Sequence, residues 1–140
     1  MALAFSFTGG VFAQIREIPR IVEETFANQY KGASNIDFQD QLVRVDVRFH
    51  LDGDTMLASY SNKGVWKETQ KRWSYDKLPQ EVKDGFTKSR YADRRVDETV
   101  VIYLPGGGEQ YRLRARKNDV EKKYLFFNTA GRLLRETITL

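Results

Sequence analysis

A chain of 140 residues, 41% hydrophobic and 30% charged, suits one compact domain that buries about two-thirds of the surface its unfolded chain exposes. It has no cysteine, which excludes disulfides, thiolate catalysis and cysteine metal ligands. The net charge of +4, from 23 basic and 19 acidic residues, permits an acidic partner and does not by itself indicate nucleic-acid binding.

The first thirteen residues, MALAFSFTGGVFA, carry no charge and end in VFA, which is typical of a signal-peptide cleavage site. The basic n-region of a signal peptide is missing, so this segment is either a truncated signal or a buried N-terminal strand. We favour the truncated signal, because polar, helix-initiating sequence follows directly. We therefore expect an exported protein of the periplasm or cell envelope, and no apolar run approaches the ~20 residues of a membrane span.

Two short amphipathic helices are predicted by a shared pattern, apolar-Pro-x-x-Val-x-x-x-Phe. It occurs in EIPRIVEETFANQY (17–30) and in KLPQEVKDGFTKSRY (77–91). Pro19 and Pro79 suit the first turn of a helix, where no backbone N–H is needed. The valine and phenylalanine of each pattern are four residues apart on one helix face and should pack on a sheet. These residues are Val22, Phe26, Val82 and Phe86.

Strand patterns follow each helix. In LVRVDVRFHL (42–51), apolar residues from Val43 to Leu51 alternate with polar ones, as in a strand with one buried and one wet face. DGD (52–54) and PGGG (105–108) are expected hairpin turns. The remaining predicted strands are 34–39, 55–60, 65–73, 94–104, 109–117, 122–127 and 132–140.

Two similar stretches end the two halves, YSNKGVWKET (60–69) and FNTAGRLLRET (127–137). Each has an aromatic residue, a polar triplet, and a glycine at the turn position where φ is positive. The sequence therefore predicts an α+β tandem repeat, α-β4-α-β4, with a four-stranded antiparallel sheet in each copy and the helices packed on one face. The copies would be residues 15–74 and 75–140, packed as one compact unit after a signal segment at 1–13.

These motifs resemble the PepSY-like family of β-lactamase-inhibitor-like exported proteins. The resemblance covers residues 15–140 and rests on the apolar-Pro helix starts, the hairpin Asp52-Gly53 and the two closing stretches. It implies two copies of a helix with a four-stranded sheet, and it specifies a fold better than a function. The family often has aspartates in the closing turns. This chain instead has Ser61, Asn62 and Lys63 in the first and Asn128, Thr129 and Ala130 in the second.

No residue constellation indicates catalysis. His50 is the only histidine, on the polar side of a predicted strand, where a solvated residue is the simpler interpretation. DGD lacks the later ligands of a calcium loop, and PGGGE (105–109) lacks the Lys-Ser/Thr and helix of a phosphate-binding loop. We therefore expect no enzyme activity, no cofactor and no metal.

The predicted surface carries two arginine rows, one in each half. Arg112, Arg114 and Arg116 alternate with apolar residues and leave the sheet on one side. If the halves join their sheets, one open face bears both rows beside Trp66, Trp73, Tyr75 or Tyr124, a composition typical of binding hot spots. A solvated face, neutralised by acids such as Glu121, explains the rows equally well. The candidate partner-binding residues are Arg44, Arg48, His50, Trp66, Trp73, Arg112, Arg114 and Arg116.

The sequence thus favours a monomeric, non-enzymatic exported module that binds an unknown protein or other acidic ligand through its open sheet face. An inhibitor-like role is implied by the resemblance alone. The alternative is a structural or folding-assistance protein of the envelope with no dominant patch. We expect no nucleic-acid partner and no transmembrane segment.

Overall fold

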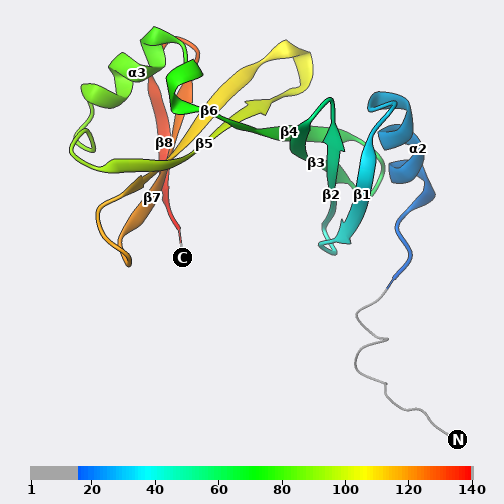
Figure 1. Cartoon of the computed structure of the whole chain (residues 1–140). Coiled ribbons are helices and arrows are strands. Elements are labelled where there is room, and N and C mark those ends of the chain that lie inside the picture. Colours follow the sequence, from blue (N-terminus) through cyan, green and yellow to red (C-terminus); the bar gives the residue numbers. More distant parts are fainter. Residues whose placement is uncertain (1–15, 140) are drawn as a thin grey trace, which may run out of the picture. The chain divides into compact units, whose positions relative to one another are not determined.

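The structure, a computed structural model, describes residues 16–139 (Figure 1). The predicted signal segment, residues 1–13, lies outside this range. No helix within residues 16–139 is long and apolar enough to cross a membrane. The helices and strands in chain order are α2 (Arg20–Gln29), β1 (Ser34–Asp40), β2 (Arg44–Leu51), β3 (Asp54–Ser61), β4 (Trp66–Trp73), α3 (Gln80–Thr87), β5 (Arg95–Tyr103), β6 (Glu109–Arg116), β7 (Lys122–Asn128) and β8 (Leu133–Ile138). Single 3-10 turns occur at Tyr75–Lys77 and Pro105–Gly107.

The predicted tandem repeat of a helix plus a four-stranded sheet is wrong. The strands form a single eight-stranded antiparallel sheet in the order β1-β2-β3-β4-β5-β6-β7-β8, and two short α-helices accompany it in the described range. Strand β4 pairs with β5, with Thr69 opposite Tyr103 and Trp73 opposite Thr99. Alternation along a strand predicts the strand but not its neighbours. The second edge of β4 exposes backbone N–H and C=O groups, and pairing with β5 satisfies them.

The chain divides into two compact units whose boundary runs through β3 and β4. Of the described residues, the first unit contains 16–53 together with Leu57–Lys67, and so includes α2, β1 and β2. The second unit contains Asp54–Met56 and residues 68–139, and so includes α3 and β5 to β8.

In the first unit, the apolar face of α2 packs on the sheet. Val22 and Phe26 are buried, which confirms the prediction from their spacing. The ring of Phe26 lies edge-to-face with Phe49, with 4.9 Å between centroids. The hydroxyl of the buried Tyr60 donates to Gln29 Oε1 at 2.7 Å, and burial raises the pKa of this phenol.

In the second unit, α3 buries Val82 and Phe86, again as predicted. They belong to an apolar cluster that includes Leu113, Leu125 and Phe127 from β6 and β7. A helix of eight residues is too short to be stable alone, so this burial is what holds it.

The glycines of the two closing stretches lie against the first turn of the helix in their own unit. A Cβ on Gly131 would meet the carbonyl oxygen of Glu81 at 1.9 Å, and a Cβ on Gly64 would meet Ile21 Cγ1 at 2.6 Å. Both glycines have positive φ, 85° and 82°. The recurring glycine is therefore required both by the turn and by the close approach of the helix.

Replacing Phe86 with alanine should lower the free energy of unfolding by about 3–5 kcal/mol, because the ring is buried in the second-unit core. Urea denaturation measures this change. Lys88→Ala, at an exposed position just after α3, is the control and should change stability by less than about 0.5 kcal/mol. Equal, small effects for both variants would contradict the packing of α3.

Replacing Gly85 with alanine should destabilise the protein, although alanine is favoured by about 1 kcal/mol in an ordinary helix. The added Cβ would lie 2.0 Å from the carbonyl oxygen of Gly131, so α3 or the β7–β8 turn must move. Thermal denaturation should show a lower Tm than wild type. An unchanged or higher Tm would show that α3 does not lie against that turn.

Candidate functional site

The predicted arginines of β6 project from the face of the second unit opposite α3. Tyr111, Leu113 and Ala115 point into the core, so the alternating residues of β6 point the other way. We call this side of β4 to β8 the open face. Arg112, Arg114 and Arg116 lie on it, as the alternation predicted.

These arginines are internally neutralised. Arg114 Nε and Arg116 Nε each bind one oxygen of Asp97, at 2.7 and 2.6 Å. A register shift between Val96 and Glu98 places Asp97 where it reaches both guanidinium groups. The hydrogen bond from Arg114, with a further one from Arg116, lowers the pKa of Asp97 to about 2 against the opposing effect of burial. The acids that offset the charge of the row are therefore Asp97, Glu98 and Asp119. Glu121 instead pairs with Arg94.

A cross-strand row on the open face alternates arginine with apolar residues. Arg72 of β4 lies opposite Val100, Val100 opposite Arg112, Arg112 opposite Phe126, and Phe126 opposite Arg135 of β8. Val100 and Phe126 are buried on this face together with Ile102. We call these five residues the cross-strand row: Arg72, Val100, Arg112, Phe126 and Arg135.

Guanidinium groups lie over two aromatic rings of the open face. Arg135 lies over the ring of Phe126 at 3.8 Å from the centroid, and Arg112 lies over Tyr124 at 4.4 Å. Arg112 also approaches Glu98 at 3.5 Å. Arg72 and Arg135 are exposed and form no ion pair with any residue in the described range. The alternation of residues within β6 could not indicate Arg72 and Arg135, which belong to other strands. Only the pairing of β4 to β8 brings them into line with Arg112.

The predicted tryptophans lie elsewhere. Trp73 is opposite Thr99, on the α3 side of the sheet, where it packs on the core. Its ring faces the ammonium groups of Lys71 and Lys77, 5.0 and 5.6 Å from the centroid. It also lines a shallow hollow of about 220 Å³ with Arg72 and Asp97. Trp66, at the start of β4, is half-buried.

The candidate residues of the first unit lie on β2. Arg44 Nε binds the buried Asp46 at 3.0 Å, and Asp46 also accepts the hydroxyl hydrogen of Ser59 at 2.8 Å. Arg48 is exposed and forms no ion pair within residues 16–139. The remaining candidate, His50, is exposed and hydrogen-bonds through Nδ1 to the side chain of Asn35 at 3.2 Å.

A strained apolar hairpin tip in the first unit was missed by the sequence prediction. Val43 was expected to begin the buried row of β2, but it lies in the β1–β2 turn and is 79% exposed. Its N–H binds the carbonyl of Gln41 at 2.8 Å around Leu42, whose φ is 69°. This γ-turn with positive φ is rare and strained, and leucine tolerates it poorly. The sequence did contain an indication of this strain: Leu42 and Val43 stand where a tight hairpin turn favours Asn-Gly or Asp-Gly.

Polar side chains hold the tip in this conformation. Asp40 Oδ1 accepts the Leu42 N–H at 2.8 Å, and the Leu42 carbonyl accepts from Asn62 at 2.7 Å and from Arg16 at 3.1 Å. The hydrogen bond from Arg16, and then that from Leu42, lowers the pKa of Asp40. These hydrogen bonds therefore hold the exposed apolar side chains of Leu42 and Val43 at the tip in one position.

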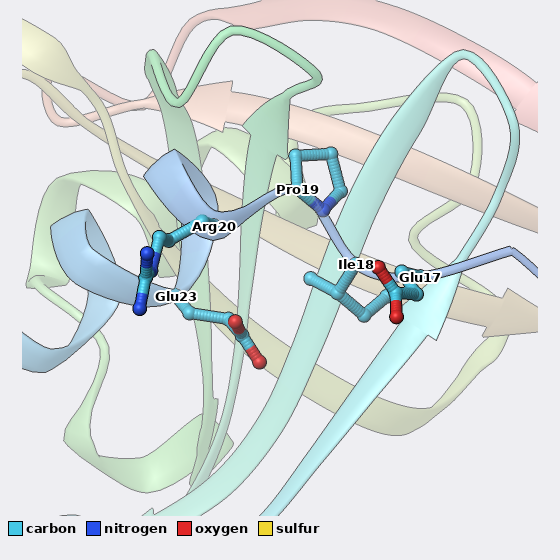
Figure 2. Close-up of a pocket in the computed structure, with 5 residues that line it drawn as sticks. All are labelled: Glu17, Ile18, Pro19, Arg20 and Glu23. Atoms are coloured by element: carbon cyan, nitrogen blue, oxygen red, sulfur yellow. The ribbon is translucent and has the colours of Figure 1, made fainter.

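A hollow of about 660 Å³ lies where the chain enters α2 (Figure 2). Glu23 and Arg20 project from the first turn of the helix, and Glu17 precedes Pro19. These three charged side chains are exposed, so the hollow is an open surface without a buried binding group in the described range.

Known structures share this fold of a single eight-stranded antiparallel sheet with two short helices. They include a DUF2874 family protein from Bacteroides ovatus ATCC 8483, which is 23% identical with a TM-score of 0.80 over 89% of each chain. A BLIP-like protein from Bacteroides fragilis NCTC 9343 is 20% identical with a TM-score of 0.79 over 92% of each chain. A protein from Bacteroides eggerthii DSM 20697, described as a candidate periplasmic protein, is 20% identical with a TM-score of 0.79, covering 88% of this chain and 90% of that one.

No protein-family profile matches the chain, and no curated protein matches it in sequence. At the identities above, the likeness to solved structures establishes the fold. The resemblance to β-lactamase-inhibitor-like proteins is thus supported at the level of fold.

Replacing Leu42 with glycine should raise the free energy of unfolding by about 0.5–1 kcal/mol, because glycine adopts φ = 69° without strain. Val43→Gly is the matched control. It lies in the same turn without positive φ, and should be neutral or destabilising. Urea denaturation compares both variants with wild type, and a loss of stability in Leu42→Gly would contradict a strained tip.

Replacing Asp97 with asparagine should lower stability at pH 7, because Arg114 and Arg116 lose their shared carboxylate. The folded pKa of about 2 lies below the ordinary 3.8, so this carboxylate stabilises the fold above about pH 4 and the contribution is lost as pH falls through 2. Urea denaturation between pH 5 and pH 2 should therefore show a steeper decline for wild type than for Asp97→Asn. Parallel curves would be the contrary result.

Proposed function

We propose that this protein is an exported, non-enzymatic binding module that holds an acidic protein surface on the open face of its second unit. The observation that carries the proposal is the cross-strand row, in which arginines of three strands flank buried Val100 and Phe126. Arginine over aromatic and apolar surface is the composition of binding hot spots.

The arginines of the open face have two different tasks in this proposal. Arg114 and Arg116 are fixed by Asp97 and keep the face rigid, which reduces the entropy lost on binding. Arg72 and Arg135 are exposed and lack ion pairs within residues 16–139, so their guanidinium groups remain for carboxylates of a partner.

Export is part of the proposal. It is supported by the apolar, uncharged sequence of residues 1–13 and by the description of the Bacteroides eggerthii structure as a candidate periplasmic protein. We also infer an inhibitor-like mode of action from the BLIP-like description of the Bacteroides fragilis structure, and membership of the PepSY-like group from the helix-start and closing motifs.

A structural or folding-assistance role in the envelope is the second candidate. The internal neutralisation of Arg114 and Arg116 favours it, because a solvated face needs carboxylates to offset crowded guanidinium groups. In that case binding would be weak and broad, and no single residue of the open face would dominate.

Affinity capture from an envelope extract of the producing organism, quantified by mass spectrometry, separates these functions. The test bait is the double variant Arg72→Ala with Arg135→Ala, which removes two exposed guanidinium groups and should leave the fold intact. The control bait is Arg132→Ala, an exposed arginine in the β7–β8 turn. A specific partner should be enriched by wild type and by the control and lost from the double variant.

For that purified partner, the Kd of the double variant should be more than about 30-fold higher than that of wild type. This rise corresponds to about 2 kcal/mol, the size of a hot-spot effect. Isothermal titration calorimetry measures it, with the circular dichroism spectrum as a check of folding. Equal affinity for all three baits would contradict the open-face proposal, and many weak partners shared by all baits would favour the structural role.

A further inference from the structure

A basic hollow lies in the second unit on the α3 side of the sheet, away from the open face. It has a volume of about 320 Å³ and contains Tyr91 in its wall. Lys123, which borders it, is opposite Ala115 of β6, a core-facing residue, so the hollow is separate from the cross-strand row. Its charged lining consists of Arg90, Arg94, Lys117 and Lys123 with Asp93 and Glu121.

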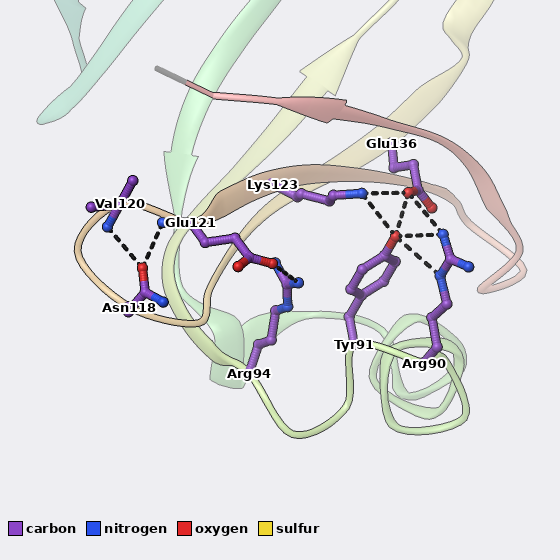
Figure 3. Close-up of polar contacts among 8 residues, drawn as sticks. All are labelled: Arg90, Tyr91, Arg94, Asn118, Val120, Glu121, Lys123 and Glu136. Atoms are coloured by element: carbon purple, nitrogen blue, oxygen red, sulfur yellow. Dashed lines mark hydrogen bonds and ion pairs between the residues drawn. The ribbon is translucent and has the colours of Figure 1, made fainter.

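Tyr91 gathers three of these cations (Figure 3). Its side chain is buried, and its hydroxyl accepts hydrogen bonds from Arg90 Nη2 at 3.0 Å and Lys123 Nζ at 3.3 Å while donating to Glu136. The charged groups of Arg90, Arg94 and Lys123 lie 5.2, 5.0 and 5.4 Å from the ring centroid. Cation–π attraction and hydrogen bonding to one tyrosine thus hold like charges close together.

Carboxylates offset only part of this charge. Glu136 is shared by Arg90 at 3.3 Å and Lys123 at 3.0 Å, and Glu121 binds Arg94 at 2.9 Å. The hydrogen bond from Tyr91, and then that from Lys123, lowers the pKa of Glu136 to about 2, so it is already fully ionised at neutral pH.

The remaining cation, Lys117, is exposed and has no side-chain partner in the described part of the chain. Counting the charged residues of the hollow together with Glu136 gives four cations against three carboxylates.

Arg94 has an unused donor. Its side chain is only 11% exposed, and while Nη2 binds Glu121, the buried Nη1 has no hydrogen-bond partner. A buried donor without an acceptor is uncommon and costs about 1–3 kcal/mol. An acceptor oxygen that enters the hollow, with a small shift of the guanidinium group, would remove this cost.

The wall around Arg94 is preformed. Asn118 Oδ1 accepts the backbone N–H groups of Val120 and Glu121 at 2.9 and 2.7 Å, and the Lys117 N–H binds the Glu121 carbonyl at 2.9 Å. These bonds fix the β6–β7 turn, and with it Glu121 and the start of the Lys117 side chain. Figure 3 shows the two bonds that Asn118 accepts.

We propose that this hollow binds a single small oxyanion, the phosphate or carboxylate group of a ligand. The guanidinium of Arg94 and the ammonium groups of Lys117 and Lys123 supply charged donors to its oxygens. This inference concerns a different surface from the open face and does not depend on the proposed function.

The test is a titration of the full chain, labelled with ¹⁵N, with inorganic phosphate and separately with acetate, at pH 7 and constant ionic strength set by sodium chloride. Saturable amide shifts should be concentrated at Tyr91, Arg94, Lys117 and Lys123. Shifts with phosphate alone identify a phosphate site, and shifts with acetate alone identify a carboxylate site. Either supports the oxyanion proposal, whereas no saturable shift with either probe overturns it.

Variants assign the binding to this hollow. Lys117→Gln removes an exposed cation without a side-chain partner, so folding is preserved, and it should raise the Kd of the bound probe about threefold. Lys88→Gln, exposed and outside the hollow, is the matched control and should leave the Kd unchanged. Arg94→Gln should abolish saturable binding, and if it does not fold, the comparison of Lys117→Gln with Lys88→Gln decides. Equal Kd values for Lys117→Gln, Lys88→Gln and wild type would overturn the assignment.

Discussion

The close approach of each helix to the glycine of the closing turn is the constraint on which the rest of the structure depends. Helices of ten and eight residues are too short to persist alone. Each is fixed by its buried valine and phenylalanine and by a glycine that leaves no room for a Cβ, Gly64 beside Ile21 and Gly131 beside Glu81. In the second unit this contact commits one face of the sheet to the core and leaves the other face for charged side chains.

The open face of the second unit combines properties usually assigned to different surfaces. Val100, Ile102 and Phe126 are buried like core residues, and the guanidinium group of Arg135 lies over the ring of Phe126. An arginine stem can lie on apolar surface while its guanidinium remains in contact with water or a carboxylate. Such a face is rigid and charged at once, and this combination suits recognition of a preformed acidic surface better than wrapping of a flexible one.

The basic hollow at Tyr91 and the open face stabilise their cationic side chains by different interactions. On the open face the arginines of β6 are paired with carboxylates. Arg72 and Arg135 beside them form no ion pair within residues 16–139. Around Tyr91 the ring itself attracts cations, and a ring has no net charge to neutralise them. The surplus positive charge therefore remains beside the unpaired Nη1 donor of Arg94.

The distinctive feature of the first unit is not charge but the strained apolar tip at Leu42.

The sequence by itself determined the strand segments, the two helices and their buried residues Val22, Phe26, Val82 and Phe86, because side-chain periodicity is a local property of the backbone. It also placed Arg112, Arg114 and Arg116 on one face. Tertiary structure alone decided that β4 pairs with β5 to make a single sheet, since pairing joins segments distant in the chain. The same register brought Arg72 and Arg135 beside Arg112 and carried Trp73 to the opposite face. Strand order and register depend on interactions between segments, and no pattern along one segment contains them.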